Sequence, residues 1–96
     1  STGGRSTVTG NRITLRDGGS LLKPRIGITC YSGDLVQGNT VLREEGAAAF
    51  RATEYTIQVS EHAAAAAVLG NILADKDVAD NGTGTVMANN VVLTTV

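Results

Sequence analysis

A short pattern recurs along this chain and constrains its fold more than any other feature. Each copy has an apolar residue three places before an Asn, Gly or Asn directly before that Asn, and an aliphatic residue shortly after it. The copies are centred on Asn11, Asn39, Asn71 and Asn90, which are 28, 32 and 19 positions apart. This spacing is typical of a repeating architecture in which each repeat stacks on the one before it.

The residue types in the pattern predict a bend between two short strands. Asn tolerates left-handed backbone geometry better than β-branched residues do, and Gly before it permits a tight turn. If the repeats stack in register, Asn11, Asn39, Asn71 and Asn90 form a ladder of side-chain hydrogen bonds along the stacking axis. Aliphatic pairs, Ile26 with Ile28 and Ile57 with Val59, precede the two middle copies and indicate a further short strand in each repeat.

The V-x-G-N pattern at Val8, Val36 and Val68, followed by an aliphatic residue, resembles the right-handed parallel β-helix of the pectin-lyase-like proteins. The resemblance covers roughly Thr7 to Leu93. It implies an all-β fold, a right-handed parallel β-helix segment of about four short turns.

Local propensity favours a different structure in one segment. Ser60 is a good N-cap, and the alanine run from Ala63 to Ala67 is typical of a helix over residues 61–74. The alternatives are therefore a small β-sandwich or an α+β domain with this helix. We favour the repeat, because Gly70 and Asn71 would be poor residues for a helix interior.

Length and composition bound the remaining possibilities. The 96 residues form one small domain, with a flexible N-terminal segment at 1–6 and a single β-rich repeat domain at 7–96. The Ser-Thr-Gly-Gly start is typical of a cut or processed end, so we expect a piece of a larger protein. A net charge of −1 gives no electrostatic basis for binding nucleic acid, and no apolar run has membrane-spanning length. Cys30, the only cysteine, excludes an internal disulfide and is expected to be buried.

No sequence motif identifies a catalytic, metal or cofactor site, so we expect none of the three. His62 follows Glu61 and is interpreted as a solvent-exposed loop residue. Adjacent Glu44 and Glu45 point to opposite faces of a strand and are expected to solubilise a loop. The aspartates beginning at Asp75 do not have the spacing of a calcium loop.

The β-helix resemblance implies a range of functions. We expect a non-catalytic structural or carbohydrate-binding module, such as part of a bacteriophage tail or fibre or of an extracellular adhesin. The alternatives are a fragment of a polysaccharide lyase, hydrolase or epimerase, and a purely architectural viral or surface-assembly subunit. The outward strand faces offer candidate glycan contacts, first Tyr31 and Tyr55, with the polar residues Thr29, Thr56 and Gln58.

The enzyme alternative and the partners follow from the same resemblance. In an enzyme, the residues to mutate are Glu44, Glu45, His62 and Asp75. Stacked repeats with exposed ends are marginally stable alone, so we expect a homo-oligomer, with a trimer favoured, or an adjoining domain. A polysaccharide is the expected ligand, and an extracellular or virion location is favoured.

Overall fold

The computed structural model describes residues 5–17 and 22–94, and this part of the chain contains short strands and no helix. The strands are β1 (Thr7–Thr9), β2 (Arg12–Leu15), β3 (Ile26–Cys30), β4 (Leu35–Gln37), β5 (Thr40–Arg43), β6 (Tyr55–Val59), β7 (Ala67–Leu69), β8 (Ile72–Ala74), β9 (Ala79–Asp80), β10 (Val86–Ala88) and β11 (Val91–Leu93). The all-β prediction is confirmed.

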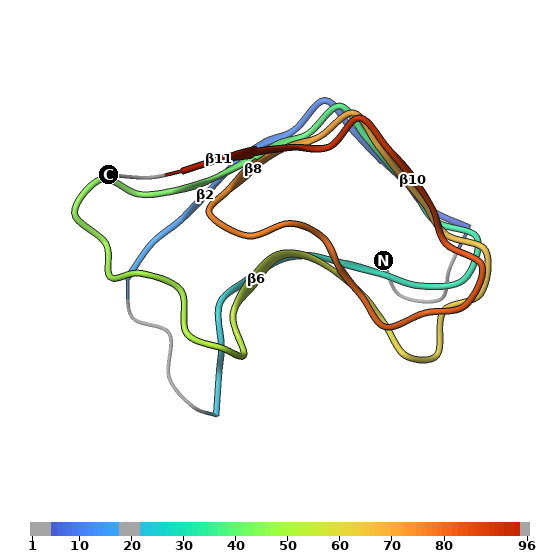
Figure 1. Cartoon of the computed structure of the whole chain (residues 1–96), viewed down its shortest axis with the longest axis horizontal. Coiled ribbons are helices and arrows are strands. Elements are labelled where there is room, and N and C mark those ends of the chain that lie inside the picture. The colour runs from blue at the N-terminus through green and yellow to red at the C-terminus, as the bar shows by residue number, and fades with distance from the viewer. Residues whose placement is uncertain (1–4, 18–21, 95–96) are drawn as a thin grey trace.

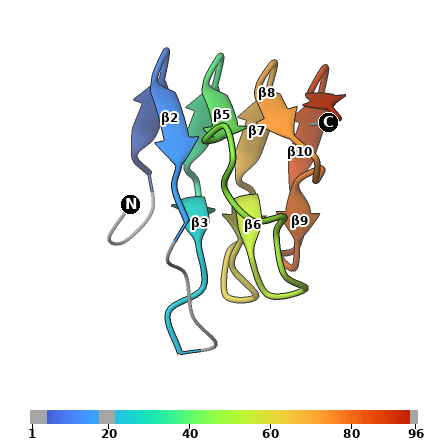
Figure 2. The same cartoon turned by 90° about the vertical axis from the view of Figure 1, so that its left-hand side faces the viewer.

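The strands form three parallel sheets that the chain visits in turn. Sheet A has the order β1-β4-β7-β10, sheet B the order β2-β5-β8-β11, and sheet C the order β3-β6-β9. One passage through the sheets makes a tier, and the four tiers begin at β1, β4, β7 and β10. The tiers superimpose when viewed along the stack (Figure 1) and lie side by side when the molecule is turned (Figure 2).

The corner between sheets A and B has the same length in every tier. Two residues separate the strands there, and the second of them is the repeated Asn: Asn11, Asn39, Asn71 or Asn90. The uneven spacing of the motif therefore arises at the other two corners. Residues 16–25 and 44–54 connect sheet B to sheet C in the first two tiers, whereas residues 75–78 suffice in the third.

Two columns of left-handed residues run along the stack. One lies directly before the ladder asparagines and contains Gly10, Gly38, Gly70 and Asn89. The other lies two residues before each strand of sheet A and contains Arg5, Gly33, Ala65 and Gly84. Since both columns repeat in every tier, the bends on either side of sheet A have the same local geometry throughout the stack.

Inward aliphatic side chains fill a narrow core between the sheets. The same position of sheet A gives Val36 and Val68, and sheet B gives Val41 and Leu73 in paired register. In sheet C the register pairs Ile28 with Ile57 and Cys30 with Val59, so the aliphatic pairs noted in the sequence are offset by two residues. A shift of two keeps these side chains on the inward face. Cys30 is fully buried, as expected.

The helix over residues 61–74 is wrong. This segment contains β7 and β8, with Val68 and Leu73 in the core. Gly70 has a φ of 63°, which no α-helix accommodates, and the alanine run instead forms a corner in which Ala65 has a φ of 60°. Helix propensity is a weak preference that the stacked sheets override. The β-sandwich alternative is also wrong, because every strand pair among the described residues is parallel.

The N-terminal segment is described only in part. Residues 1–4 of the segment expected to be flexible lie outside the described residues. Arg5 donates its backbone N–H to the Ser32 carbonyl at 2.8 Å, and the Ser6 carbonyl accepts from the Leu35 N–H at 2.9 Å. None of the described segments forms a helix of the length and apolarity that crossing a membrane requires.

Candidate functional site

The repeated asparagines lie in a row at the corner between sheets A and B, joined by hydrogen bonds. The Oδ1 of Asn71 accepts from the backbone N–H of Asn39 at 2.9 Å and from its Nδ2 at 3.1 Å. The Nδ2 of Asn39 also donates to the Val8 carbonyl, one tier back, at 2.8 Å. The same pattern joins Asn11 to Asn39 and Asn71 to Asn90.

This ladder is structural, since Asn39 and Asn71 are fully buried. Burying an amide without hydrogen bonds is costly, and the ladder supplies partners for its N–H groups and its oxygen. Among the described residues, no buried side-chain nitrogen or oxygen lacks a partner. The ladder thus fixes the register between tiers, and the side-chain amides of its two buried members, Asn39 and Asn71, have partners within the chain.

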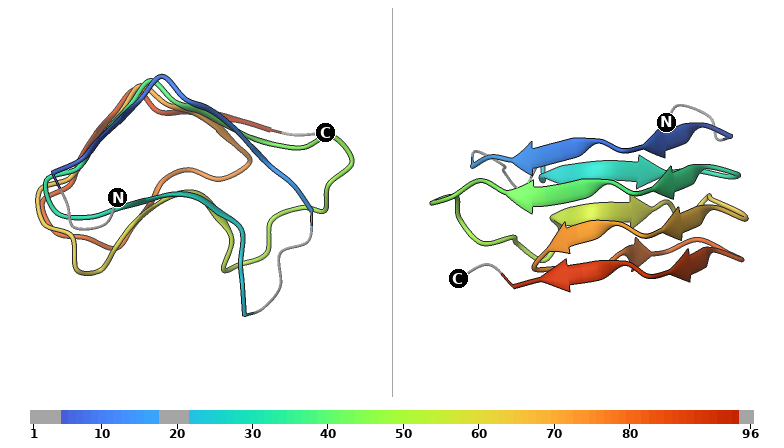
Figure 3. Two further views of the ribbon diagram at one scale, coloured as in Figure 1. Left: turned by 180° about the vertical axis from the view of Figure 1, so that it is seen from behind. Right: turned by 90° about the horizontal axis from the view of Figure 1, so that it is seen from above.

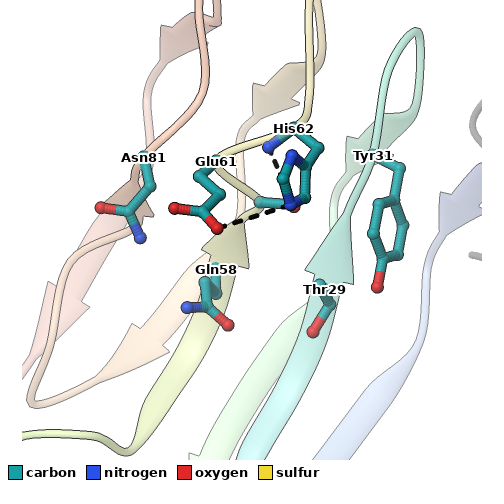
Figure 4. Close-up of a pocket in the computed structure, with 7 residues that line it drawn as sticks. Thr29, Tyr31, Gln58, Glu61, His62 and Asn81 are labelled. Carbon is teal, nitrogen blue, oxygen red and sulfur yellow. Dashed lines mark hydrogen bonds and ion pairs between the residues drawn. The ribbon is translucent and has the colours of Figure 1, made fainter.

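The outer face of sheet C carries a depression of about 480 Å³ lined by polar side chains. Its residues come from adjacent tiers: Thr29, Tyr31, Gln58, Ser60, Glu61, His62 and Asn81. The register of sheet C pairs Thr29 with Gln58, and Tyr31 directly follows the end of β3. Figure 4 shows Asn81, Glu61, His62 and Tyr31 in a row, with Gln58 and Thr29 beneath them.

Hydrogen bonds between side chains and the backbone hold the rim of the depression. The buried carboxylate of Asp34 accepts from the backbone N–H of Tyr31 through Oδ2 and from that of Ser6 through Oδ1, both at 2.8 Å. The N–H of His62 donates to Ser60 Oγ at 3.2 Å, and its carbonyl accepts from Ser32 Oγ at 3.3 Å. The His62 backbone is therefore fixed while its imidazole is exposed, 3.4 Å from Glu61.

Only part of the glycan-binding surface predicted from sequence lies in this depression. Thr29, Tyr31 and Gln58 line it, but Tyr55 does not. Tyr55 lies on the side of β6 that carries the buried Ile57, and its ring lies beneath Lys76, whose Nζ is 4.9 Å from the ring centroid. Thr56 is not available for contact: it shares the face of Gln58 along β6, but its side chain is fully buried and donates to the Lys76 carbonyl at 3.1 Å.

The four residues considered for catalysis lie at two separate places. Exposed Glu44 and Glu45 follow β5, and Asp75 follows the neighbouring strand β8 and accepts from Arg43 Nε at 3.1 Å. His62 follows β6, at the opposite end of sheet C, so a whole strand separates it from the acidic residues. A five-residue strand spans roughly 16 Å, beyond the reach of general acid–base partners.

The other aspartates after β8 make local hydrogen bonds. Asp77 Oδ1 accepts from the Val78 N–H at 2.7 Å, and Asp80 Oδ1 accepts from the Gly82 N–H and the Thr85 hydroxyl. Within residues 5–17 and 22–94, no group of three or more His, Cys, Asp or Glu side chains is arranged to hold a metal ion.

A buried ion pair outside this depression was not predicted from the sequence. Glu54 is fully buried, and its carboxylate accepts from the Nε and Nη2 of Arg25 and from the backbone N–H groups of Arg25 and Arg51. These hydrogen bonds, chiefly from the Arg25 side chain, hold the pKa of Glu54 well below its usual range although burial acts the other way. The 29-residue separation of Arg25 and Glu54, across connections of unequal length, left no signal in the sequence.

Comparison with known proteins adds no assignment. No protein-family model matches the chain, and no similarity to a curated protein or a solved structure was found.

Proposed function

We propose that the chain is a right-handed parallel β-helix module. Three parallel sheets visited in a fixed order support this proposal. Connections between parallel strands of one sheet are right-handed in about 98% of cases, which favours that hand here. The constant two-residue corner at the asparagine ladder and the core that the first three tiers share also fit such a fold.

We further propose that the module is non-catalytic and binds a carbohydrate on the outer face of sheet C. The observation that carries the proposal is the depression in which one aromatic ring adjoins hydroxyl, amide and carboxylate groups. Sugars present both apolar C–H faces and hydroxyl groups, and such a surface is complementary to both.

Different residues of the depression would contact the apolar face and the hydroxyl groups of a sugar. The Tyr31 ring provides the apolar face against which a pyranose packs. The amides of Gln58 and Asn81 each offer a donor and an acceptor, and the Glu61 carboxylate accepts from sugar hydroxyls. With no arginine or lysine among the lining residues, a neutral sugar is favoured over an acidic one.

The lining residues come from adjacent tiers, so a bound chain would extend across the strands. Tyr31 follows β3, His62 follows β6 and Asn81 follows β9. Neighbouring tiers are separated by about 4.8 Å, and contacts repeat at that distance along the stack. This geometry favours an oligosaccharide over a single sugar, as expected for a module of a phage fibre or an extracellular adhesin that contacts polysaccharide.

Screening the protein on an array of neutral and acidic glycans, followed by calorimetry on the best ligand, tests this function. Tyr31→Ala and Gln58→Ala should each weaken binding by roughly tenfold or more, because each removes a contact of about 1.4 kcal/mol. Gln37→Ala is the matched control: Gln37 is exposed on the outer face of sheet A, and binding should be unchanged. A ligand whose affinity is insensitive to Tyr31 and Gln58, or the absence of any glycan ligand, would contradict the proposal.

A further inference from the structure

The two ends of the stack are chemically different, and the difference is set by the asparagine ladder. In each step, the earlier Asn donates through its backbone N–H and its Nδ2, and the Oδ1 of the later Asn accepts. At the first tier, Asn11 donates to Asn39, and no described residue donates to its own Oδ1. At the last tier, Asn90 accepts from Asn71 and its Nδ2 donates to the Val68 carbonyl, but its backbone N–H has no acceptor among the described residues.

The last tier also leaves apolar side chains uncovered. Met87 and Val92 continue the inward columns of Val68 and Leu73, yet they are 45% and 39% exposed where those two residues are fully buried. Val86, Val91 and Leu93 on the same two strands are 48–59% exposed. β10 and β11 are edge strands, and unpaired edges of this kind are templates for pairing with a further strand.

The first tier offers the complementary surface. β1 and β2 are the opposite edges of sheets A and B, and they carry Val8 and Ile13 in the same inward columns. The charges of the two ends differ but do not conflict. β1, β2 and the residues that flank them, 5–17, carry three arginines and one aspartate, whereas residues 86–94 carry no charge and the nearest carboxylates not paired with an arginine are Asp77 and Asp80, beside β9 at the last edge of sheet C.

We propose that a second copy of this chain stacks head to tail on the last tier, with its first tier pairing with β10 and β11. The Oδ1 of the incoming Asn11 then accepts from the backbone N–H and Nδ2 of Asn90, as each ladder oxygen does within the chain. Met87 and Val92 are covered by the incoming Val8 and Ile13. Such a contact joins two different surfaces, so it repeats and yields open-ended stacks rather than a closed ring.

Cross-linking between two singly substituted proteins tests the register. Ala88 and Thr9 are exposed and occupy the same position in the first and last strands of sheet A, so stacking places them on neighbouring strands. Strands about 4.8 Å apart fall within the separation that a disulfide bridges. An equal mixture of Ala88→Cys and Thr9→Cys should form a mixed disulfide dimer on mild oxidation, and each variant alone should not. The buried Cys30 stays unreactive in both.

Sedimentation as a function of concentration provides the second readout. Met87→Lys places an unpaired ammonium group in the stacking surface and should weaken association roughly tenfold or more. Leu22→Lys is the matched control, since Leu22 is an exposed apolar residue of the connection between β2 and β3 and lies on none of the strands that pair in the stack, and association should be unchanged. A monomer at all concentrations, a closed side-by-side trimer, or disulfide dimers formed by Ala88→Cys alone would each overturn the proposal.

Discussion

Arg25 Nε and Glu54 Oε2 lie 3.0 Å apart, and the backbone N–H of Arg25 donates to the same carboxylate oxygen at 2.9 Å. This contact joins the strand entrances of β3 and β6, which carry the first two tiers of sheet C. The Arg25 guanidinium also lies 5.0 Å from the Phe50 ring and donates to the carbonyls of Ala48 and Ala49. One buried ion pair thus fixes the longest connection of the chain against its neighbour.

Removing the charge of Glu54 should destabilise the fold. In Glu54→Gln the shape of the side chain is kept, but the hydrogen bonds between ions are lost, which costs about 2 kcal/mol. Urea unfolding followed by circular dichroism measures the change. Glu61→Gln, the same substitution at an exposed position, should change the free energy of unfolding by less than about 0.5 kcal/mol. Equal effects of the two substitutions would contradict a stabilising role for the buried pair.

The same carboxylate should make stability sensitive to acid. The pKa of Glu54 is lowered in the folded protein, so its contribution is complete above the pKa of about 4.3 that a glutamate has in an unfolded chain. Below that pH the unfolded state binds a proton that the folded state excludes, and the free energy of unfolding falls as the pH falls. Unfolding measured at roughly pH 6 and roughly pH 3 should show a smaller loss for Glu54→Gln than for the unsubstituted protein. If the free energy of unfolding fell equally in the two proteins, Glu54 would not be the source of the acid sensitivity.

The asparagine ladder should tolerate substitution at its end but not in its interior. Asn39→Ala leaves the backbone N–H of Asn11 and the Val8 carbonyl without their partners and opens a cavity, at a cost of about 2 kcal/mol or more. Asn11→Ala removes an exposed side chain whose backbone bond to Asn39 persists, and it should cost about 0.5 kcal/mol. Thermal unfolding of the two variants distinguishes them, and equal melting temperatures would contradict the ladder's role in stability.

The left-handed columns predict opposite effects for reciprocal substitutions. Ala65→Gly relieves the strain of an L-residue at a φ of 60° and should raise stability by up to about 1 kcal/mol. Gly38→Ala should lower it by a similar amount, about 1 kcal/mol, from backbone strain alone. The added Cβ at Gly38 meets no atom within 4 Å, so no steric clash contributes. Melting temperatures should shift by about 4–8 °C per kcal/mol, and shifts of the same sign would contradict this explanation.

Cys30 should be inert in the folded protein. Burial raises the pKa of its thiol to about 11, and the nearby Asp34 carboxylate acts in the same direction. Labelling with a chromogenic thiol reagent should therefore be slow in buffer and rapid in denaturant, at a rate limited by unfolding or local opening. Rapid stoichiometric labelling without denaturant would show that the thiol is accessible.

The corner at the ladder asparagines could be predicted from sequence because its length never changes. A two-residue bend with Gly and Asn leaves the same residue types at the same offsets in each tier, even though Asn89 replaces Gly in the last. The second left-handed column lies five residues before the first, a constant interval, but glycine occupies only two of its four positions, Gly33 and Gly84. Arg5 and Ala65 are held in this conformation by backbone hydrogen bonds to other segments, from the Arg5 N–H to the Ser32 carbonyl and from the Ala65 N–H to the Thr83 carbonyl.

The depression was harder to predict, because it depends on which way each strand faces. Thr29 and Gln58 face outward, but Tyr55 shares the side of Ile57, and Thr56 is covered by the chain near Lys76. Successive side chains of a strand point to opposite faces, so the sequence of β6 alone could have placed Tyr55 and Gln58 on different faces of the sheet. The cover over Thr56 comes from residues 75–78, and neither their length nor their path follows from local sequence.

The corner at the asparagines has a fixed length, whereas the other connections vary in length. The spacing between tiers is therefore independent of the shape of the molecule around its perimeter. Between sheets B and C the chain uses ten, eleven or four residues. The described parts of these connections lie along one margin of the stack (Figure 3). Lengthening one of them adds little closure entropy and leaves the tiers above and below in register. Insertions can therefore accumulate at that margin, tier by tier, and change what the surface displays while the spacing of the scaffold stays the same.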